Sequence, residues 1–233
     1  MTHLQMTEQE QNLLKLGGLA GILGSIIFIV VFFIVGIFVG ADPVDLEGWL
    51  TRFPSIRTAR IFENGLYLLV LILWIPSTLA LYYKLKSKSL AYALFGAGIG
   101  IVGLGIIAAG AMPHIAHSQL ADIYYAADAT PETQATIVLM WQGTWAIMDE
   151  LLIVGLAFMP LSLFCFGVAM RQHPDFGNGY GWMSIIIAIL GLGTILVSLF
   201  DPYSTLVAIL VFGLIIFHFV VGLKLFNLSR RSA

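Results

Sequence analysis

The chain has 233 residues, of which 59% are hydrophobic and 10% are charged, and its formal net charge is −2. Water-soluble proteins contain about 45–50% apolar and about 25% charged residues, so this composition excludes an ordinary soluble domain and indicates one integral membrane domain. The Lys and Arg residues are scattered and outnumbered by acidic ones, so we expect no binding to nucleic acid.

Six apolar segments of the sequence are long enough to cross a bilayer, which takes about 20 helical residues. Because the lipid interior offers backbone groups no hydrogen-bond partner, each segment is predicted to be helical. The fold class predicted for residues 1–233 is therefore an all-α, polytopic membrane helix bundle. The first segment is expected to be a retained anchor, since it is longer than the roughly 7–15 apolar residues of a signal peptide. The predicted spans are residues 16–40, 64–83, 90–112, 140–170, 181–200 and 204–226.

Two segments between the spans predict interfacial helices on the outer face of the membrane. Residues 42–53 begin with Asp-Pro, a typical cap and first helical position, and their apolar residues fall on one helical face. Pro54 is predicted to end this helix. The second interfacial helix is predicted within residues 114–133, before Pro131 starts the fourth span.

The fourth span is longer than a bilayer requires. From Pro131 to Met170 a continuous helix would extend about 60 Å, against a hydrocarbon core of about 30 Å. We therefore expect this helix either to project beyond the lipid or to break near Gly143.

The distribution of Lys and Arg predicts the orientation of the chain. If the N-terminus is cytoplasmic, most of these residues fall on the cytoplasmic side, and only Arg52, Arg57 and Arg60 fall on the other. Both chain ends are then predicted to be cytoplasmic.

A weak internal similarity favours a parallel two-hairpin repeat. Residues 73–79 resemble residues 157–163, each with a central proline, and residues 101–105 resemble residues 189–193, each with paired glycines. The second and third spans would then correspond to the fourth and fifth. Apolar segments also match by chance, and both interpretations stay open.

The candidate functional residues are ionisable side chains at the outer edge of the spans, because such groups are costly near lipid. If the spans form one bundle, these residues would line an outward-facing polar cavity that binds a ligand. Glu63 and at least one of Asp149 and Glu150 are predicted to face the bundle interior, within reach of residues 114–117. A partner such as Arg60, an imidazole or a polar backbone group is expected near a buried carboxylate. The simpler alternative is that charged residues only end helices at the interface. The candidates are Glu63, His114, His117, Asp149 and Glu150.

The histidines raise the question of a metal or haem. His114 and His117 have a spacing that places both imidazoles on one helical face, as in some zinc sites, but nothing directs them toward a carboxylate. His218 lies in the middle of the sixth span without a second histidine at its depth, so a bis-histidine haem is not expected. We predict no metal and no cofactor. Phosphate-binding loops and nucleophile elbows are also missing from the sequence.

One set of short motifs resembles a known group of proteins. The segment Ile75–Lys86 (IPSTLALYYKLK), followed by a glycine-rich span, is similar to bacterial multi-pass membrane proteins that share a conserved domain of unknown function. Residues 17–22 and 119–124 fit the same pattern. The resemblance implies a six-helix bundle in a bacterial inner (plasma) membrane and supplies no catalytic residues.

The expected function is binding of a small or lipid-like ligand in the outer cavity, as a carrier or sensor and not as an enzyme. The alternatives are an accessory subunit of a larger membrane complex and a metal-dependent membrane enzyme. The expected partners are membrane lipids and either other membrane subunits or a second copy of the chain.

Overall fold

A computed structural model describes residues 7–40, 46–201 and 204–230. Within these ranges the chain forms six helices that are each long and apolar enough to cross a membrane, which confirms the predicted all-α bundle. A π-helical turn, η1 (Val35–Val39), continues the first helix. The helices are α1 (Glu8–Ile34), α2 (Leu46–Leu85), α3 (Leu90–Tyr124), α4 (Pro131–Arg171), α5 (Gly177–Phe200) and α6 (Val207–Arg230).

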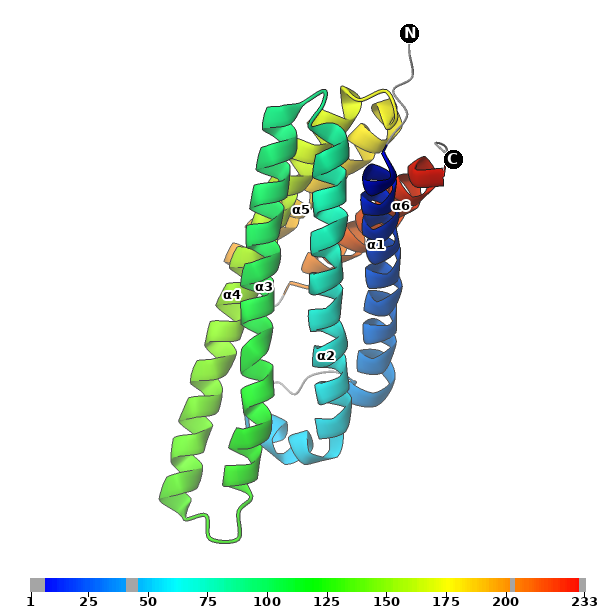
Figure 1. Ribbon diagram of the computed structural model, residues 1–233. Helices are drawn as coiled ribbons and strands as arrows, with labels where there is room; N and C mark the ends of the chain where they lie inside the picture. The colour runs from blue at the N-terminus through cyan, green and yellow to red at the C-terminus, as the bar shows by residue number, and fades with distance from the viewer. Residues whose placement is uncertain (1–6, 41–45, 202–203, 231–233) are drawn as a thin grey trace.

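The helices pack in chain order, and the last returns to the first (Figure 1). Each helix contacts its neighbours in sequence, α6 packs against α1, and α2 also contacts α4 and α6. The start of α1 and the end of α6 lie at one end of the bundle, here called the termini end (Figure 1). The turn between α3 and α4 lies at the opposite end, here called the hairpin end. The predicted internal repeat stays a prediction.

The α3–α4 hairpin projects past the other helices at the hairpin end (Figure 1). Helix α4 has 41 residues and is unbroken at Gly143, so it extends about 60 Å at 1.5 Å per residue. The alternative of a break near Gly143 was therefore wrong. The side chain of Thr130 caps the first turn of α4, with Pro131 at the first helical position, as the sequence predicts.

Small residues allow α3 and α4 to approach closely along their shared length. A Cβ atom added to Gly155 of α4 would lie 2.9 Å from the Ile107 nitrogen and 3.0 Å from the Gly103 oxygen, both on α3. Ser162 of α4 donates a hydrogen bond of 2.7 Å to the backbone oxygen of Gly96. Backbone contact of this kind is the usual basis of helix association in lipid, where burial of apolar surface gives little driving force.

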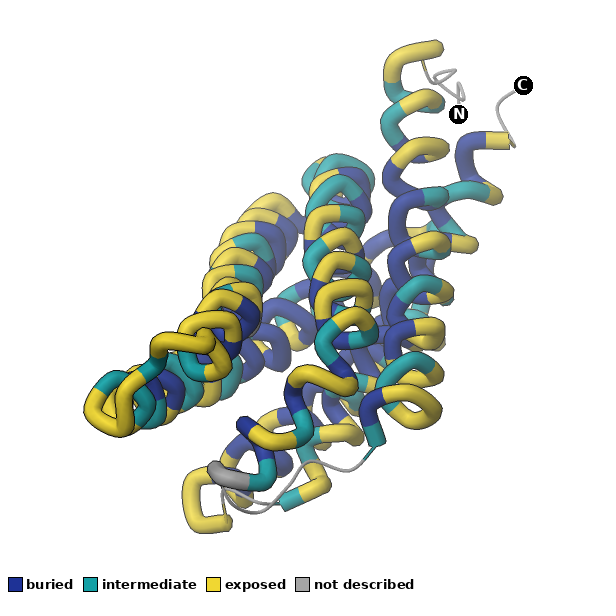
Figure 2. The backbone as a smooth tube through the Cα atoms, turned by 90° about the horizontal axis from the view of Figure 1, so that it is seen from below, coloured by how far each residue is buried: buried dark blue, intermediate teal, exposed yellow. Residues whose placement is uncertain are grey.

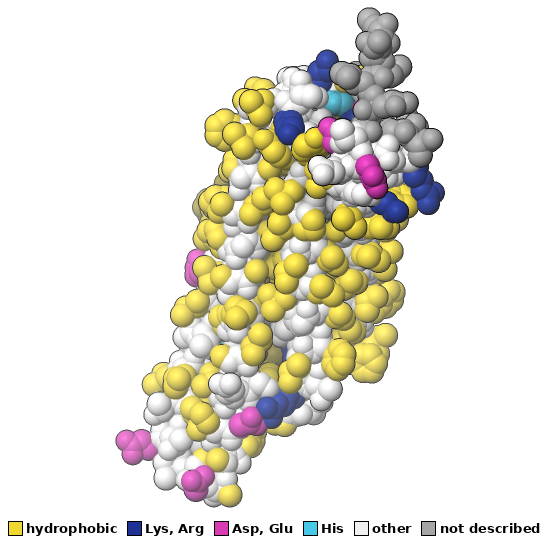
Figure 3. Space-filling view, in the orientation of Figure 1, with side chains coloured by type: hydrophobic (Ala, Val, Ile, Leu, Met, Phe, Trp, Pro, Cys, Tyr) yellow, Lys and Arg dark blue, Asp and Glu magenta, His cyan; other side chains and the backbone are white. Residues whose placement is uncertain are grey.

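Apolar side chains both fill the bundle and cover its outside. The main core contains Trp74, Leu163 and Phe166, all nearly inaccessible to solvent. Buried residues face inward and exposed ones outward along each helix (Figure 2). The exposed face in Figure 3 is largely apolar along its middle, with charged side chains mainly toward the two ends. An apolar exterior of this kind is expected of a protein that lipid surrounds.

The first predicted interfacial helix is not a separate element. Helix α2 runs through Pro54 without ending, so the prediction that Pro54 terminates a helix was wrong. Proline removes the hydrogen bond that its nitrogen would donate to the carbonyl four residues earlier, here that of Leu50. The Tyr125 hydroxyl donates to this carbonyl at 2.8 Å and replaces the lost bond. The predicted start at residues 42–45 lies outside the described residues.

The second predicted interfacial helix is also part of a longer helix. Helix α3 continues through Pro113 to Tyr124 and forms one side of the projecting hairpin. A small separate core holds this region together, in which Leu50 and Phe53 of α2 pack against Leu120 of α3 and Trp141 of α4. Packing against α2 and α4 therefore keeps residues after Pro113 in line with the span.

Candidate functional site

Polar and aromatic side chains from three helices meet at the hairpin end. We call this group the hairpin-end cluster. It combines large aromatic rings with buried polar groups, an arrangement typical of binding sites. The residues in contact are Trp49, Arg60 and Glu63 of α2, His117 of α3, and Trp141, Thr144 and Trp145 of α4. We also count Ser118, which directly follows His117 in α3 and is buried.

A buried ion pair forms the α2 side of the cluster. Arg60 Nη1 donates to Glu63 Oε2 at 3.0 Å, and the two side chains are only 7% and 13% exposed. The guanidinium also lies over the Trp49 ring, 5.1 Å from its centre. Of the partners expected for a buried carboxylate, Arg60 is therefore one that pairs with Glu63. A buried charge that loses its partner is strongly destabilising, so the two residues depend on one another.

His117 is the polar centre of the α3 side. The residue is 2% exposed, and its ring stacks on Trp141 with 4.2 Å between ring centres. Its Nε2 atom lies 2.9 Å from Thr144 Oγ1. The Thr144 hydroxyl can donate to the Met140 carbonyl at 3.0 Å, which leaves its oxygen to accept a hydrogen bond from the Nε2–H group. This network holds the imidazole in one orientation beside Arg60, which acts on it electrostatically.

Two buried polar groups in the cluster make no hydrogen bond with any described residue. They are the Ser118 hydroxyl and the indole N–H of Trp141. An unsatisfied buried polar group costs about 1–3 kcal/mol, and native structures contain few of them. Ser118 directly follows His117 in α3, and Trp141 of α4 stacks on the His117 ring. The cluster therefore has two hydrogen-bond donors that its own side chains do not satisfy.

The two adjacent carboxylates of α4 lie outside the cluster. Asp149 and Glu150 are both exposed, so the prediction that at least one of them faces the bundle interior was wrong. The buried face of this part of α4 instead carries Trp141 and Met148, which are seven residues, or two helical turns, apart. With Met148 on the buried face, Asp149 and Glu150 fall on the exposed side of the helix. Asp149 accepts a hydrogen bond from the Trp145 side chain, at the edge of the cluster.

The remaining predicted residue is His114, which belongs to α3 but whose side chain lies outside the described part of the structure. Among the described side chains, no three His, Cys, Asp or Glu residues gather as ligands for one metal ion. His117 itself contacts Thr144 and Trp141, and Arg60 is a charged residue that acts on it electrostatically.

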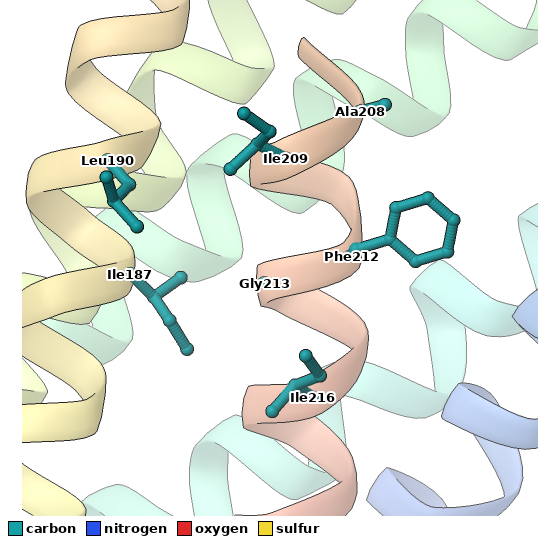
Figure 4. Close-up of a pocket in the computed structure, with 7 residues that line it drawn as sticks. All are labelled: Ile187, Leu190, Ala208, Ile209, Phe212, Gly213 and Ile216. Carbon is teal, nitrogen blue, oxygen red and sulfur yellow. The ribbon is translucent and has the colours of Figure 1, made fainter. Parts of the chain in front are cut away.

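Two hollows open elsewhere on the surface. One, of about 400 Å³, lies between α5 and α6 and is lined only by apolar side chains and glycine, such as Leu190, Phe212 and Ile216 (Figure 4). The other, of about 250 Å³, lies at the termini end between α1 and α6. Neither is lined by a residue of the hairpin-end cluster, which in this conformation is filled by its own side chains.

His218 is buried deep in the bundle, as the sequence indicates. The residue is 2% exposed, and its ring stacks on Trp74 of α2 with 4.2 Å between centres and 11° between planes. Phe217 contacts the same imidazole edge-on. The ring therefore packs between α6 and α2 as part of the core.

An ion pair at the termini end joins the last turn of α2 to the connection between α4 and α5. Asp175 Oδ2, between α4 and α5, lies 2.7 Å from Lys84 Nζ of α2, and the Asp175 N–H donates to His173 Nδ1 at 3.2 Å. Burial lowers the pKa of His173 below its usual 6.5. Burial raises the pKa of Asp175, but the hydrogen bond and charge of Lys84 outweigh it, so this pKa is lowered.

Sequence reasoning did not select the α4 members of the cluster. The sequence pattern that could have identified them is the spacing of Trp141, Thr144 and Trp145, which places the three side chains on one face of α4. Trp145 packs on Trp49 with 4.6 Å between ring centres. An aromatic face on a helix longer than a bilayer predicts a packing partner for that face, which here is the first part of α2.

Comparisons with protein-family models, curated proteins and solved structures find no match to this chain.

Proposed function

We propose that the chain is a multi-pass protein of a bacterial inner membrane whose hairpin-end cluster binds a small or lipid-like ligand from the outer side, as a carrier or sensor. The observation that carries the proposal is the pair of buried donors, Ser118 and Trp141, without a described partner. They belong to the same cluster as the buried Arg60–Glu63 ion pair and His117. A ligand with hydrogen-bond acceptors would satisfy the donors, and the aromatic rings would hold its apolar part.

The test is the recovery of small molecules and lipids that co-purify with the protein in lipid nanodiscs. The double substitution Arg60→Gln, Glu63→Gln removes both charges of the cluster while it keeps the side-chain volumes similar. The control is Arg57→Gln, Asp122→Asn, which removes an exposed ion pair between α2 and α3. We expect one compound that is enriched about tenfold by the wild type and the control and not by the cluster variant. Equal recovery from all three proteins would contradict the proposal.

The proposed orientation places the termini end in the cytoplasm and the hairpin end outside. Lys84, in the last turn of α2, and Lys88, between α2 and α3, belong to the termini end, and the positive-inside rule supports this choice. Single cysteines at the exposed positions Ser87 and Ala127, in a Cys165→Ala background, test it with a membrane-impermeant thiol reagent. We expect Ser87→Cys to react only from the cytoplasmic side and Ala127→Cys only from outside. The reverse pattern would reverse the orientation.

A role as an accessory subunit is the second candidate function. The half of α4 nearest the hairpin turn exposes Leu139, Met140 and Ile147, which are 68%, 50% and 56% exposed. Exposed apolar residues on a part of a helix that projects past the bundle are typical of a surface that another membrane protein covers. Substitution Leu139→Glu, Ile147→Glu should then abolish co-purification of a defined subunit while the isolated chain stays folded.

A further inference from the structure

The hollow at the termini end lies where α1 and α6 diverge. Deeper in the bundle the two helices touch through backbone atoms, because a Cβ added to Gly18 would lie 2.7 Å from the Phe226 nitrogen. One turn nearer the termini, the hollow of about 250 Å³ opens between the helices, which lie side by side in Figure 1. Gly18 thus fixes the crossing point, and the hollow follows from the angle between the helices. Its lining residues are Gln11, Asn12, Lys15, Ser229 and Arg230.

The lining of this hollow is positively charged and rich in hydrogen-bond donors. Lys15 and Arg230 approach it from opposite helices, and no carboxylate of a described residue lines it. Among the described residues, neither cation forms an ion pair with a carboxylate. Asn12 contributes a side-chain amide, and Ser229 donates its own proton to the Phe226 carbonyl at 2.7 Å. Two cations with amide donors and no competing acid are the groups that bind a phosphate oxygen.

The hollow also lies at the end of two apolar helices, where lipid headgroups are expected. Lys15 is followed directly by Leu16, which is 65% exposed, and Leu23, one heptad further along α1, is 49% exposed. Arg230, in the last turn of α6, lies over the Phe226 ring, 4.5 Å from its centre. Long basic side chains at this position place their charges at the height of phospholipid phosphates.

We propose that this hollow binds the phosphate of an anionic phospholipid in the leaflet at the termini end, with Lys15 and Arg230 on the phosphate and the acyl chains along the exposed apolar face of α1. A free phosphate ester carries the same phosphate group and could bind to the same two cations. The exposed Leu16 and Leu23 below the cations favour the lipid, because a soluble ester would leave them without a contact. The site is at the opposite end of the bundle from the hairpin-end cluster and does not depend on a function there.

The test is titration of the detergent-solubilised full chain with phosphatidylglycerol, followed by native mass spectrometry. The test variant is Lys15→Gln, Arg230→Gln. Both side chains are exposed in the wild type, so the double substitution should leave the fold intact. The matched control is Lys86→Gln, Lys88→Gln, which removes two cations from the same end of the bundle outside the hollow. We expect the variant to bind the first phosphatidylglycerol about tenfold more weakly than the wild type, while the control binds within about twofold.

Three results would overturn the proposal. Equal affinity of the variant and the wild type would show that the hollow is not the site. Equal loss in the variant and the control would show a general effect of surface charge. Displacement of phosphatidylglycerol by glycerol phosphate at equal concentration would show that the site recognises a free phosphate ester and not a lipid. Weak binding of phosphatidylcholine, whose choline offsets the phosphate charge, would support the requirement for an anionic headgroup.

Discussion

The contact between α1 and α6 makes a quantitative prediction at Gly222. A Cβ atom at this position would lie 2.8 Å from the Gly18 oxygen, 3.0 Å from the Ile22 nitrogen and 3.3 Å from the Gly21 carbonyl carbon. All three atoms belong to the α1 backbone, which cannot rotate away as a side chain can. The substitution Gly222→Ala therefore forces the two helices apart over their shared contact.

The magnitude follows from two opposing effects. Overpacking of a well-packed interior costs about 1–3 kcal/mol. Replacement of a helical glycine by alanine returns up to about 1 kcal/mol through helix propensity. Gly98→Ala, on the exposed face of α3, is the control because a Cβ there meets no atom within 4 Å. Both variants share the propensity gain, so the difference between them isolates the overpacking cost, and Gly222→Ala should be less stable by about 1–3 kcal/mol.

The assay is reversible unfolding of the purified protein in mixed micelles with increasing SDS, followed by tryptophan fluorescence. The free energy of unfolding should rise slightly or stay unchanged for Gly98→Ala and fall for Gly222→Ala. If Gly222→Ala were as stable as Gly98→Ala, the close approach of α1 and α6 would not be a feature of the folded protein, and the argument that places the termini-end hollow would lose its basis.

Two further predictions concern the polar contacts. Because the pKa of His173 is lower in the folded than in the unfolded protein, the free energy of unfolding should fall as the pH drops below about 6.5. The lowered pKa of Asp175 adds to this loss near its usual value of 3.8. Thermal unfolding of His173→Asn should show a flatter pH dependence between about pH 6.5 and 5 than the wild type; an unchanged slope would assign the effect to other groups. Tyr125→Phe removes the donor to the Leu50 carbonyl and should cost about 0.5–1.5 kcal/mol in SDS unfolding, whereas Tyr124→Phe should cost little, and equal losses would contradict this role of the hydroxyl.

The hairpin end shows where sequence reasoning stops. The spacing of Arg60 and Glu63, three residues apart, is enough to predict their ion pair, because residues at that separation meet on any helix. The direction in which the Asp149 side chain points could not be predicted from local spacing. Its exposure depends on how α4 is rotated about its axis, and that rotation is set by the contacts that Trp141 and Gly155 make with α3.

The sequence by itself determined that this chain is a bundle of apolar helices and roughly where each one lies, because lipid leaves a backbone no alternative to helix and hydropathy is a property of each residue. It also indicated that α4 exceeds bilayer length. Only the tertiary structure decided that α2 continues through Pro54, since the Leu50 carbonyl that proline leaves without a donor is satisfied by Tyr125, 75 residues away in the chain. It likewise decided that His117 is buried against Trp141. Such contacts join residues that no local pattern relates, so they depend on how complete helices pack.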